Sequence, residues 1–354
     1  MNDKFMHKEF NITTVVDGLK EALQQKIDNK TKPVGALGRL ETIALQVGLI
    51  QQRLDPVLEN PLLAVFAGDH GIAKEGIVNA YPQEVTAQMV QNMVAGGAAV
   101  NVFCRTHGIA TKIVDAGVGS ELPADDNLID RKIAMGTANY LEQSAMSVQE
   151  CEKAIQTGAQ LVDEWHKEGT NIIGFGEMGI ANTSSAAIIT GLITGQSIEA
   201  CTGKGTGLDK KGVSKKARVL KQAIQTHDIA DNPISILQTF GGFEIAMIVG
   251  GMLQAAEHRM VILVDGFIAT AAFLLACELH PEARGYGIFA HQSDEQGHHI
   301  QLEYLQAEPL LQLGMRLGEG TGAAMAYPIV RSAVNFLNEM ASFEDAGVSQ
   351  GGKE

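Results

Sequence analysis

The chain has few cysteines, few aromatic residues and an excess of acidic over basic residues, and each of these shortages excludes a class of protein. The four cysteines are widely spaced and form no C-x-x-C pair, which fits neither a disulfide framework nor a zinc ribbon. Lys and Arg number 27 against 41 Asp and Glu, which gives a formal net charge of -14. Such a chain repels a phosphate backbone unless its cations cluster, and the only basic cluster, over residues 204–221, is short. We therefore expect no nucleic-acid partner.

Long uninterrupted apolar segments are also missing. The N-terminal stretch MNDKFMHKEF lacks the apolar region of a signal peptide, and the most lipid-like stretch, residues 260–277, is interrupted by Asp265 and Gly266. These features predict a cytoplasmic protein with no membrane contact. Hydrophobic residues nevertheless make up 45% of the 354 residues, which is enough to bury a core and excludes a disordered chain.

Five short apolar runs give the chain its main pattern. They begin near residues 62, 111, 171, 260 and 286, and each ends in a polar or glycine-rich cluster that is followed by a helical stretch. This alternation predicts an α/β fold with a parallel sheet wound with helices. The first 60 residues and the segment after residue 302 have helical periodicity instead.

The predicted strands end in polar residues. In open parallel sheets, ligands bind beyond the carboxyl ends of the strands, so these residues are expected to converge on one cleft. Alternatively, they are helix caps and turn formers, which Asp and Ser often are. The residues are Asp69, His70, Asp115, Glu177, Asp265, His291 and Ser293.

Two segments have the character of anion-binding sites. In GEMGIANTSS, Asn182 and Thr183 open a helix, and a helix N-terminus lined with small polar side chains attracts anions. The loop GKGTG, from Gly203 to Gly207, matches neither a P-loop nor a dinucleotide fingerprint, but its N–H groups can form an anion nest. A flexible connection is the alternative for that loop. Together the two segments suggest a phosphorylated small molecule, with Lys204 or Lys216 supplying positive charge.

A glutamate between glycines and a group of histidines complete the candidates. Glu319, in LGEGTG, has room to act as a general base toward a flat ligand, although a solvated turn residue would have the same pattern. His291, His298 and His299 lie near Asp294 and Glu295 but lack the spacing of a known zinc motif. We therefore expect no metal.

Several sequence motifs of the chain, taken together, resemble those of one known family. The following blocks occur in this order along the chain: KPVGALGRLE (32–41), FAGDHGI (66–72), YPQEVTAQMV (81–90), GGAAVNV (96–102), GEMGIANT (176–183), GTGLD (205–209), GGFEIAMIVG (241–250), DGFI (265–268) and LGEGTGAA (317–324). With these blocks, the chain resembles the nicotinate-nucleotide–dimethylbenzimidazole phosphoribosyltransferase family over roughly residues 30–335. At position 181 the family pattern has Gly where this chain has Ala.

The resemblance implies both a fold and a reaction. The fold would be a Rossmann-like α/β domain over residues 61–302, with a smaller helical domain built from residues 1–60 and 303–354. The reaction would move the phosphoribosyl group of nicotinate mononucleotide to 5,6-dimethylbenzimidazole, with inversion at the anomeric carbon, and would yield α-ribazole 5′-phosphate and nicotinate. No cofactor would be needed, and the chain would form a homodimer.

By the same resemblance, three residues are catalytic. Glu319 is the expected general base, Glu177 lies near the ribose, and Lys216 is the active-site lysine, although the adjacent Lys215 fits the pattern as well. The remaining expected contacts bind substrate: Tyr81, Gln88, Met178, Gly179, Asn182, Thr183, Gly203, Gly205, Asp265, Ser293, Leu317 and Gly318.

Two other functions compete with this reading. One is a metal-dependent phosphohydrolase that uses Asp69, His70, His291 and His298. The other is a nucleotide-binding protein without catalysis, which would have no need of Glu319. The sequence also leaves the acceptor base open, because a methyl group in an apolar pocket is worth only about 1–3 kcal/mol.

Overall fold

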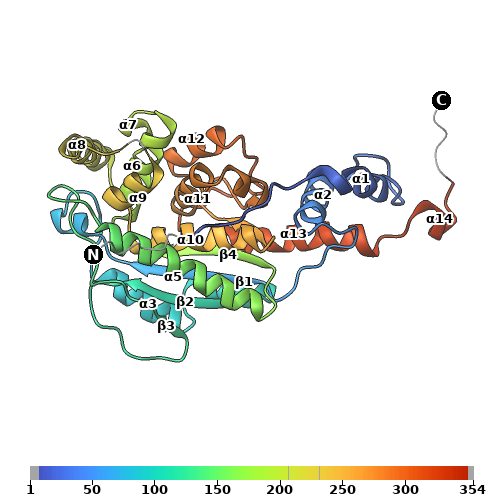
Figure 1. The fold of residues 1–354 in the computed structure, drawn as a ribbon, viewed down its shortest axis with the longest axis horizontal. Helices are drawn as coiled ribbons and strands as arrows, with labels where there is room; N and C mark the ends of the chain where they lie inside the picture. Colours follow the sequence, from blue (N-terminus) through green and yellow to red (C-terminus); the bar gives the residue numbers. More distant parts are fainter. Residues whose placement is uncertain (1–7, 206, 231, 350–354) are drawn as a thin grey trace.

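The computed structural model describes residues 8–205, 207–230 and 232–349 and is built around one sheet (Figure 1). The sheet has six strands, all parallel, in the order β3-β2-β1-β4-β5-β6. This is the strand order of a Rossmann fold, so the predicted fold class is confirmed. The strands are β1 (Leu62–Gly68), β2 (Ala110–Gly117), β3 (Leu128–Asp130), β4 (Ile172–Met178), β5 (Val261–Val264) and β6 (Gly287–Phe289).

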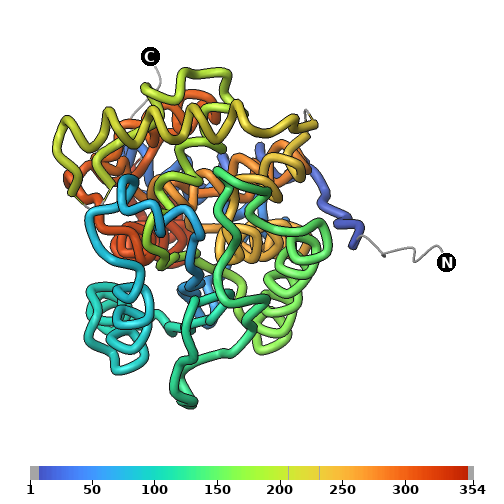
Figure 2. Tube along the Cα trace, turned by 90° about the vertical axis from the view of Figure 1, so that its left-hand side faces the viewer, coloured from blue at the N-terminus to red at the C-terminus, as the bar shows by residue number. Residues whose placement is uncertain are grey.

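Helices cover both faces of the sheet. Figure 2 shows α3, α4 and α13 on one side of the strands, and α5 and α10 on the other. The helices are α1 (Lys20–Asp28), α2 (Arg39–Gln51), α3 (Val85–Val94), α4 (Ala99–His107), α5 (Val148–Lys167), α6 (Asn182–Thr194), α7 (Ile198–Cys201), α8 (Lys210–Thr226), α9 (Pro233–Phe240), α10 (Phe243–Glu257), α11 (Phe267–Leu279), α12 (Gln296–Tyr304), α13 (Thr321–Glu339) and α14 (Phe343–Ala346).

Burial on both faces explains the composition of the strands. Every residue of β1 is buried, so this strand is a continuous apolar run rather than an alternating one. The small residues serve close packing between helices. A Cβ atom on Gly158 of α5 would lie 1.9 Å from the Met247 carbonyl oxygen of α10, so only glycine lets the two backbones come this close.

The helices from the two ends of the chain lie together, away from most of the sheet (Figure 1). α13 packs against β4 and β5, then extends to α2. Beyond α13, the backbone N–H of Phe343 donates to the Asn29 carbonyl, and Lys30 pairs with Ser342 in a β-bridge. The division into domains stays a prediction, and its boundary after residue 302 falls inside α12.

The sheet places a cleft where its connections change direction. β1 and β4 are neighbours in the middle of the sheet, yet the chain leaves β1 toward β2 and leaves β4 toward β5. Parallel sheets bind ligands at the carboxyl ends of such strands. Among the described residues, no helix is long and apolar enough to cross a membrane.

Candidate functional site

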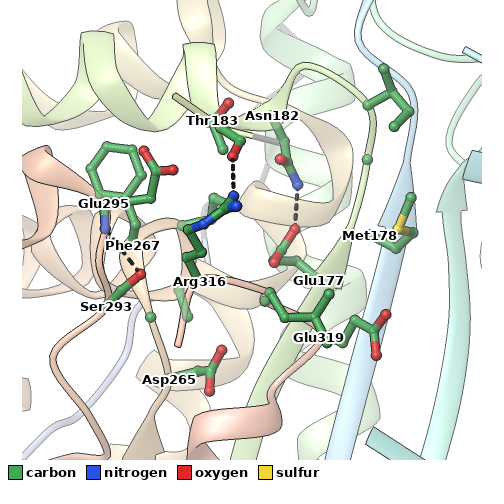
Figure 3. Close-up of a pocket in the computed structure, with 18 of the residues that line it drawn as sticks. Glu177, Met178, Asn182, Thr183, Asp265, Phe267, Ser293, Glu295, Arg316 and Glu319 are labelled. Atoms are coloured by element: carbon green, nitrogen blue, oxygen red, sulfur yellow. Dashed lines mark hydrogen bonds between the residues drawn. The ribbon is translucent and has the colours of Figure 1, made fainter. Parts of the chain in front are cut away.

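A cavity of about 380 Å³ opens at this position (Figure 3). Its walls come from the ends of β4 and β5, the segment after β6, the start of α6 and the loop before α13. Most of the predicted site residues line it. They are Tyr81, Glu177, Met178, Gly179, Asn182, Thr183, Gly205, Asp265, Ser293, Leu317, Gly318 and Glu319.

Two predicted binding residues, Gln88 and Gly203, do not line the cavity. Gln88 is exposed on α3, whose Val85 and Met89 face the cavity instead. Successive helix residues are about 100° apart, so Gln88 is turned aside from that face. Gly203 is buried behind Glu295, because a Cβ atom on Gly203 would lie 1.9 Å from the Glu295 Oε2 atom.

Lys216, the predicted active-site lysine, does not line the cavity either. The positively charged residue that does line it is Arg316, which the sequence did not predict. Lys216 is buried and its Nζ donates a 2.7 Å hydrogen bond to Thr183 Oγ1, whereas Lys215 is exposed. Arg316 lines the cavity and donates a hydrogen bond to the Gly205 carbonyl oxygen (Figure 3). Its position just before LGEGTG was the available signal.

Of the seven polar strand-end residues, only Glu177, Asp265, His291 and Ser293 converge on the cavity. The other three do not line the cavity and are engaged with protein groups elsewhere. Asp69 accepts a 2.7 Å hydrogen bond from the Gly119 N–H, and Asp115 forms a 2.8 Å ion pair with Lys132. His70 forms a 2.5 Å contact with Glu244 in a fully buried pair.

Glu177 is the most strongly perturbed carboxyl in the site. It lies one residue before the end of β4 and accepts a hydrogen bond from the Asn182 amide (Figure 3). Burial raises its pKa to about 8, and the nearby charges of Asp265 and Glu244 add to the rise, while the Asn182 hydrogen bond opposes it. These surroundings therefore hold Glu177 mainly protonated at neutral pH.

Glu319 occupies a strained turn against β4. Its backbone has φ +64°, which costs energy for a residue other than glycine. A Cβ atom on Gly176 would lie 2.1 Å from the Glu319 carbonyl oxygen, and one on Gly318 would lie 2.4 Å from Glu177 Oε1. Only glycines at these two positions allow both glutamates to approach the same space.

The Glu319 carboxylate faces the N-terminus of α4. It accepts a 3.4 Å hydrogen bond from the Val100 N–H, and the helix dipole favours its charged form. Burial nonetheless raises the pKa of Glu319, with a smaller contribution from Asp265. A buried carboxylate of raised pKa is a stronger base than an exposed one, which suits proton abstraction.

Asp265 connects β5 to the helix that follows Glu319. Its Oδ1 accepts a 2.8 Å hydrogen bond from the Ala323 N–H in the first turn of α13. Burial raises the pKa of Asp265, while His291 opposes the rise. The carboxyl end of β5 thus positions α13, and with it the turn that carries Glu319.

One end of the cavity, which Glu295 also lines, has groups suited to anions. It combines the N-terminus of α6, the buried Gly205 loop residue and the two cations Arg316 and Lys216. Burial lowers the pKa of Lys216 to about 8, and the charge of Glu295 partly offsets this. Ala181 precedes α6 with φ +78°, a backbone conformation that favours the Gly of the family pattern.

The histidines are not arranged as a metal centre. Within the part of the chain that the structure describes, no group of three or more His, Cys, Asp or Glu side chains could hold a metal ion. His298 accepts a 2.8 Å hydrogen bond from the Ser293 N–H and lies 3.1 Å from Thr270 Oγ1. Burial lowers its pKa to about 3, so it stays neutral. His70 and His298, which a metal-dependent phosphohydrolase would need as ligands, are engaged with protein groups.

The cavity is thus divided into an acidic part and a cationic part. Glu177, Asp265 and Glu319 surround one part, which suits a positively charged ring or sugar. The other part suits a phosphate. Apolar side chains of Tyr81 and Leu317 stand at the opening, where 50% and 59% of their surface is exposed.

Comparison with known proteins agrees with this geometry. Residues 12–348 match the family model DBI_PRT, described as phosphoribosyltransferase. A nicotinate-nucleotide–dimethylbenzimidazole phosphoribosyltransferase from Dechloromonas aromatica is 55% identical over 97% of this chain and 99% of its own length. The protein of the same name from Cupriavidus necator is 55% identical over 96% of this chain and 97% of its own. The crystal structure of CobT from Thermus thermophilus superposes with a TM-score of 0.89 at 40% identity, covering 94% of this chain and 99% of that one.

Proposed function

Because the chain belongs to the phosphoribosyltransferase family, we propose that it transfers the phosphoribosyl group of nicotinate mononucleotide to 5,6-dimethylbenzimidazole. The products are nicotinate and α-ribazole 5′-phosphate, with inversion at the anomeric carbon. The observation that carries the proposal is the divided cavity. Nicotinate mononucleotide has a cationic ring at one end and a phosphate at the other, and the two parts of the cavity have the opposite charges.

The reaction exchanges one carbon–nitrogen bond for another. The bond between the ribose C1′ atom and the nicotinate ring nitrogen breaks, and its electron pair stays with the ring, which loses its positive charge. One benzimidazole nitrogen forms the new bond to C1′ from the opposite face. The proton on the other benzimidazole nitrogen goes to Glu319. Alignment of the two substrates supplies much of the acceleration.

Glu177 supports the sugar as it gains positive charge. Before the substrate binds, the pKa of about 8 keeps Glu177 mainly protonated at neutral pH. A bound pyridinium ring favours the charged carboxylate, so substrate binding releases this proton. The resulting anion stabilises the oxocarbenium-like transition state, as carboxylates do in glycoside chemistry.

The phosphate lies at the cationic end of the cavity. Thr183 and Gly205 offer donors there, Arg316 offers a guanidinium group, and Lys216 supports Thr183 from behind. The flat base enters from the opening, between Tyr81 and Leu317. Because both side chains are half or more exposed, this rim also fits the homodimer implied by the family resemblance, which light scattering tests. Location in the cytoplasm remains a prediction.

A product assay tests the proposal. Purified protein is mixed with nicotinate mononucleotide and 5,6-dimethylbenzimidazole, with and without EDTA, and products are separated by chromatography and identified by mass. We expect α-ribazole phosphate in both samples. Glu319→Gln is expected to lower kcat by about 10²–10⁴-fold, since general base catalysis is worth that much. Release of inorganic phosphate that EDTA abolishes would support the hydrolase instead. Nucleotide binding without any product would support the binding protein.

A further inference from the structure

A carboxylate lies where the phosphate is expected to bind. Glu295 lines the cavity beside Gly205 and Arg316, and only 6% of its surface is exposed. Figure 3 shows its carboxylate on the same side of the cavity as Thr183 and the Arg316 guanidinium. A negative charge inside an anion site repels an anionic ligand, so the position of the Glu295 carboxylate needs an explanation.

Glu295 is placed near the cations without being tied to them. Among the described residues, its Oε2 atom has no hydrogen-bond partner, and Lys216 and Arg316 act on Glu295 through their charge alone. Behind the carboxylate stands Gly203, where any Cβ atom would collide with Oε2. The absence of a side chain at Gly203 therefore leaves room for the Glu295 carboxylate, although its Oε2 atom has no hydrogen-bond partner among the described residues.

The position of Glu295 is explained by the balance of charge with Lys216 and Arg316. Lys216 is only 1% exposed, and an uncompensated buried cation is costly. Glu295 offsets the positive charge of Lys216 and Arg316. When a dianionic phosphate arrives, the same cations face three negative charges, and one of these must be neutralised or move away.

We propose that Glu295 is an internal counter-ion of the anion site, which takes up a proton when a phosphate dianion binds and so limits how tightly the site holds its phosphate. This inference rests on the proposed function, since it places the nucleotide phosphate at this end of the cavity. Glu295 then determines affinity: it keeps binding of the phosphate weak enough for the product to leave.

The surroundings of Glu295 allow this proton uptake. Burial raises the pKa of Glu295, whereas Lys216, the Gly205 N–H and Arg316 oppose the rise. Asp294, in the same segment, adds to it. From α12, His298 faces this region as a neutral group, because its pKa is about 3. Removing part of the cations' attraction, as a bound dianion does, raises the pKa of Glu295 further.

Sulfate is the probe, because it stays a dianion over the whole range used. Its dissociation constant is measured by calorimetry in the full-length protein from about pH 5 to about pH 6.5, where Lys216, with a pKa of about 8, stays protonated. In the wild type, we expect sulfate binding to weaken as the pH rises and to take up protons, seen by comparing two buffers of different ionisation enthalpy. Glu295→Gln is expected to bind sulfate about tenfold more tightly at the upper pH, with little pH dependence.

Asp294→Asn is the matched control. It removes a carboxylate one residue away that is exposed and outside the cavity, and it should keep the pH dependence of the wild type. In turnover, Glu295→Gln should lower both the KM for nicotinate mononucleotide and kcat, because the phosphorylated product leaves more slowly. A residue with a purely structural role would not lower both.

Several outcomes overturn the inference. Sulfate binding without proton uptake in the wild type does so even when Glu295→Gln fails to fold. The inference is also overturned if sulfate binding has the same pH dependence in Glu295→Gln and in the wild type. It is overturned as well if product forms but sulfate does not compete with nicotinate mononucleotide. Failure of the proposed function looks different: no product forms, whereas sulfate binding responds to Glu295 as expected.

Discussion

The close approach of β4 to the turn that carries Glu319 leads to a sharp prediction. Changing Gly176 to Ala adds one methyl group against the backbone of the turn and alters no side chain that takes part in the reaction. Its Cβ would lie 2.1 Å from the Glu319 carbonyl oxygen and 2.5 Å from the carbonyl carbon. Both are backbone atoms, so no side-chain rotation relieves the contact. Ordinary contact begins at 3.4 Å, so the turn and the strand must separate by about 1.3 Å.

That displacement sets the expected size of the effect. A shift of about 1 Å in a catalytic group costs about 10²-fold in rate. Overpacking of this kind costs about 1–3 kcal/mol of stability, which a protein of this size tolerates. We therefore expect Gly176→Ala to lower kcat by about 10²-fold while the protein remains folded, because the turn moves and the sheet does not unfold.

Gly174→Ala provides the control. Gly174 lies two residues earlier on β4, on the same face of the strand, and its added Cβ would meet the Ala323 side chain at 3.1 Å. That contact is relieved by a few tenths of an ångström. The assay compares kcat for α-ribazole phosphate formation with the thermal midpoint of each variant. Full kcat in a well-folded Gly176→Ala protein would refute the placement of Glu319 as base. An equal loss in Gly174→Ala would show that any change in β4 is harmful.

Three further predictions follow from buried charges. Lys216→Met should raise the KM for nicotinate mononucleotide about tenfold or more, because it removes the donor to Thr183, whereas Lys215→Met on the exposed face should leave it unchanged; steady-state kinetics with both variants decides, and equal effects would contradict the assignment. Glu177 has a folded pKa of about 8, whereas an exposed glutamate has a pKa of 4.5, so the folded state keeps a proton that the unfolded state loses. Its contribution to the free energy of unfolding therefore falls as the pH rises between these values. Glu177→Gln should therefore flatten the loss of stability between about pH 5 and about pH 7.5, as measured by urea unfolding; an unchanged slope would contradict the raised pKa. His70→Ala should cost about 3–5 kcal/mol in the same measurement, because it leaves the Glu244 carboxylate buried without its partner, and a loss below 1 kcal/mol would show that the pair is not needed.

The strands could be predicted because burial on both faces turns each one into a short apolar run. The runs near residues 62, 111, 171, 260 and 286 all became strands of the sheet. Strand β3 was not predicted, because it has only three residues, none of them fully buried, and so does not form an apolar run in the sequence. The site residues at the ends of β4 and β5 followed from topology, since parallel strands deliver their last residues to one edge.

The rest of the site depends on contacts between distant segments. His70 is turned away from the cavity by Glu244, which lies 174 positions later in the chain, and no local pattern reveals that partner. Arg316 enters the cavity from an irregular segment without periodicity. The choice between Lys215 and Lys216 depends on which side of α8 is buried, and sequence alone left both open.

Helix α13 connects the turn that carries Glu319 to the helices formed by the two ends of the chain. The helix begins two residues after Glu319 and runs for 19 residues, about 28 Å, to the helices of the chain ends. Over that length, a tilt of about 2° moves one end by about 1 Å relative to the other, which is the displacement that costs a catalytic group most of its rate. We therefore expect the packing of α1, α2 and α14 around the far end of α13 to influence the rate, although none of their residues lines the cavity.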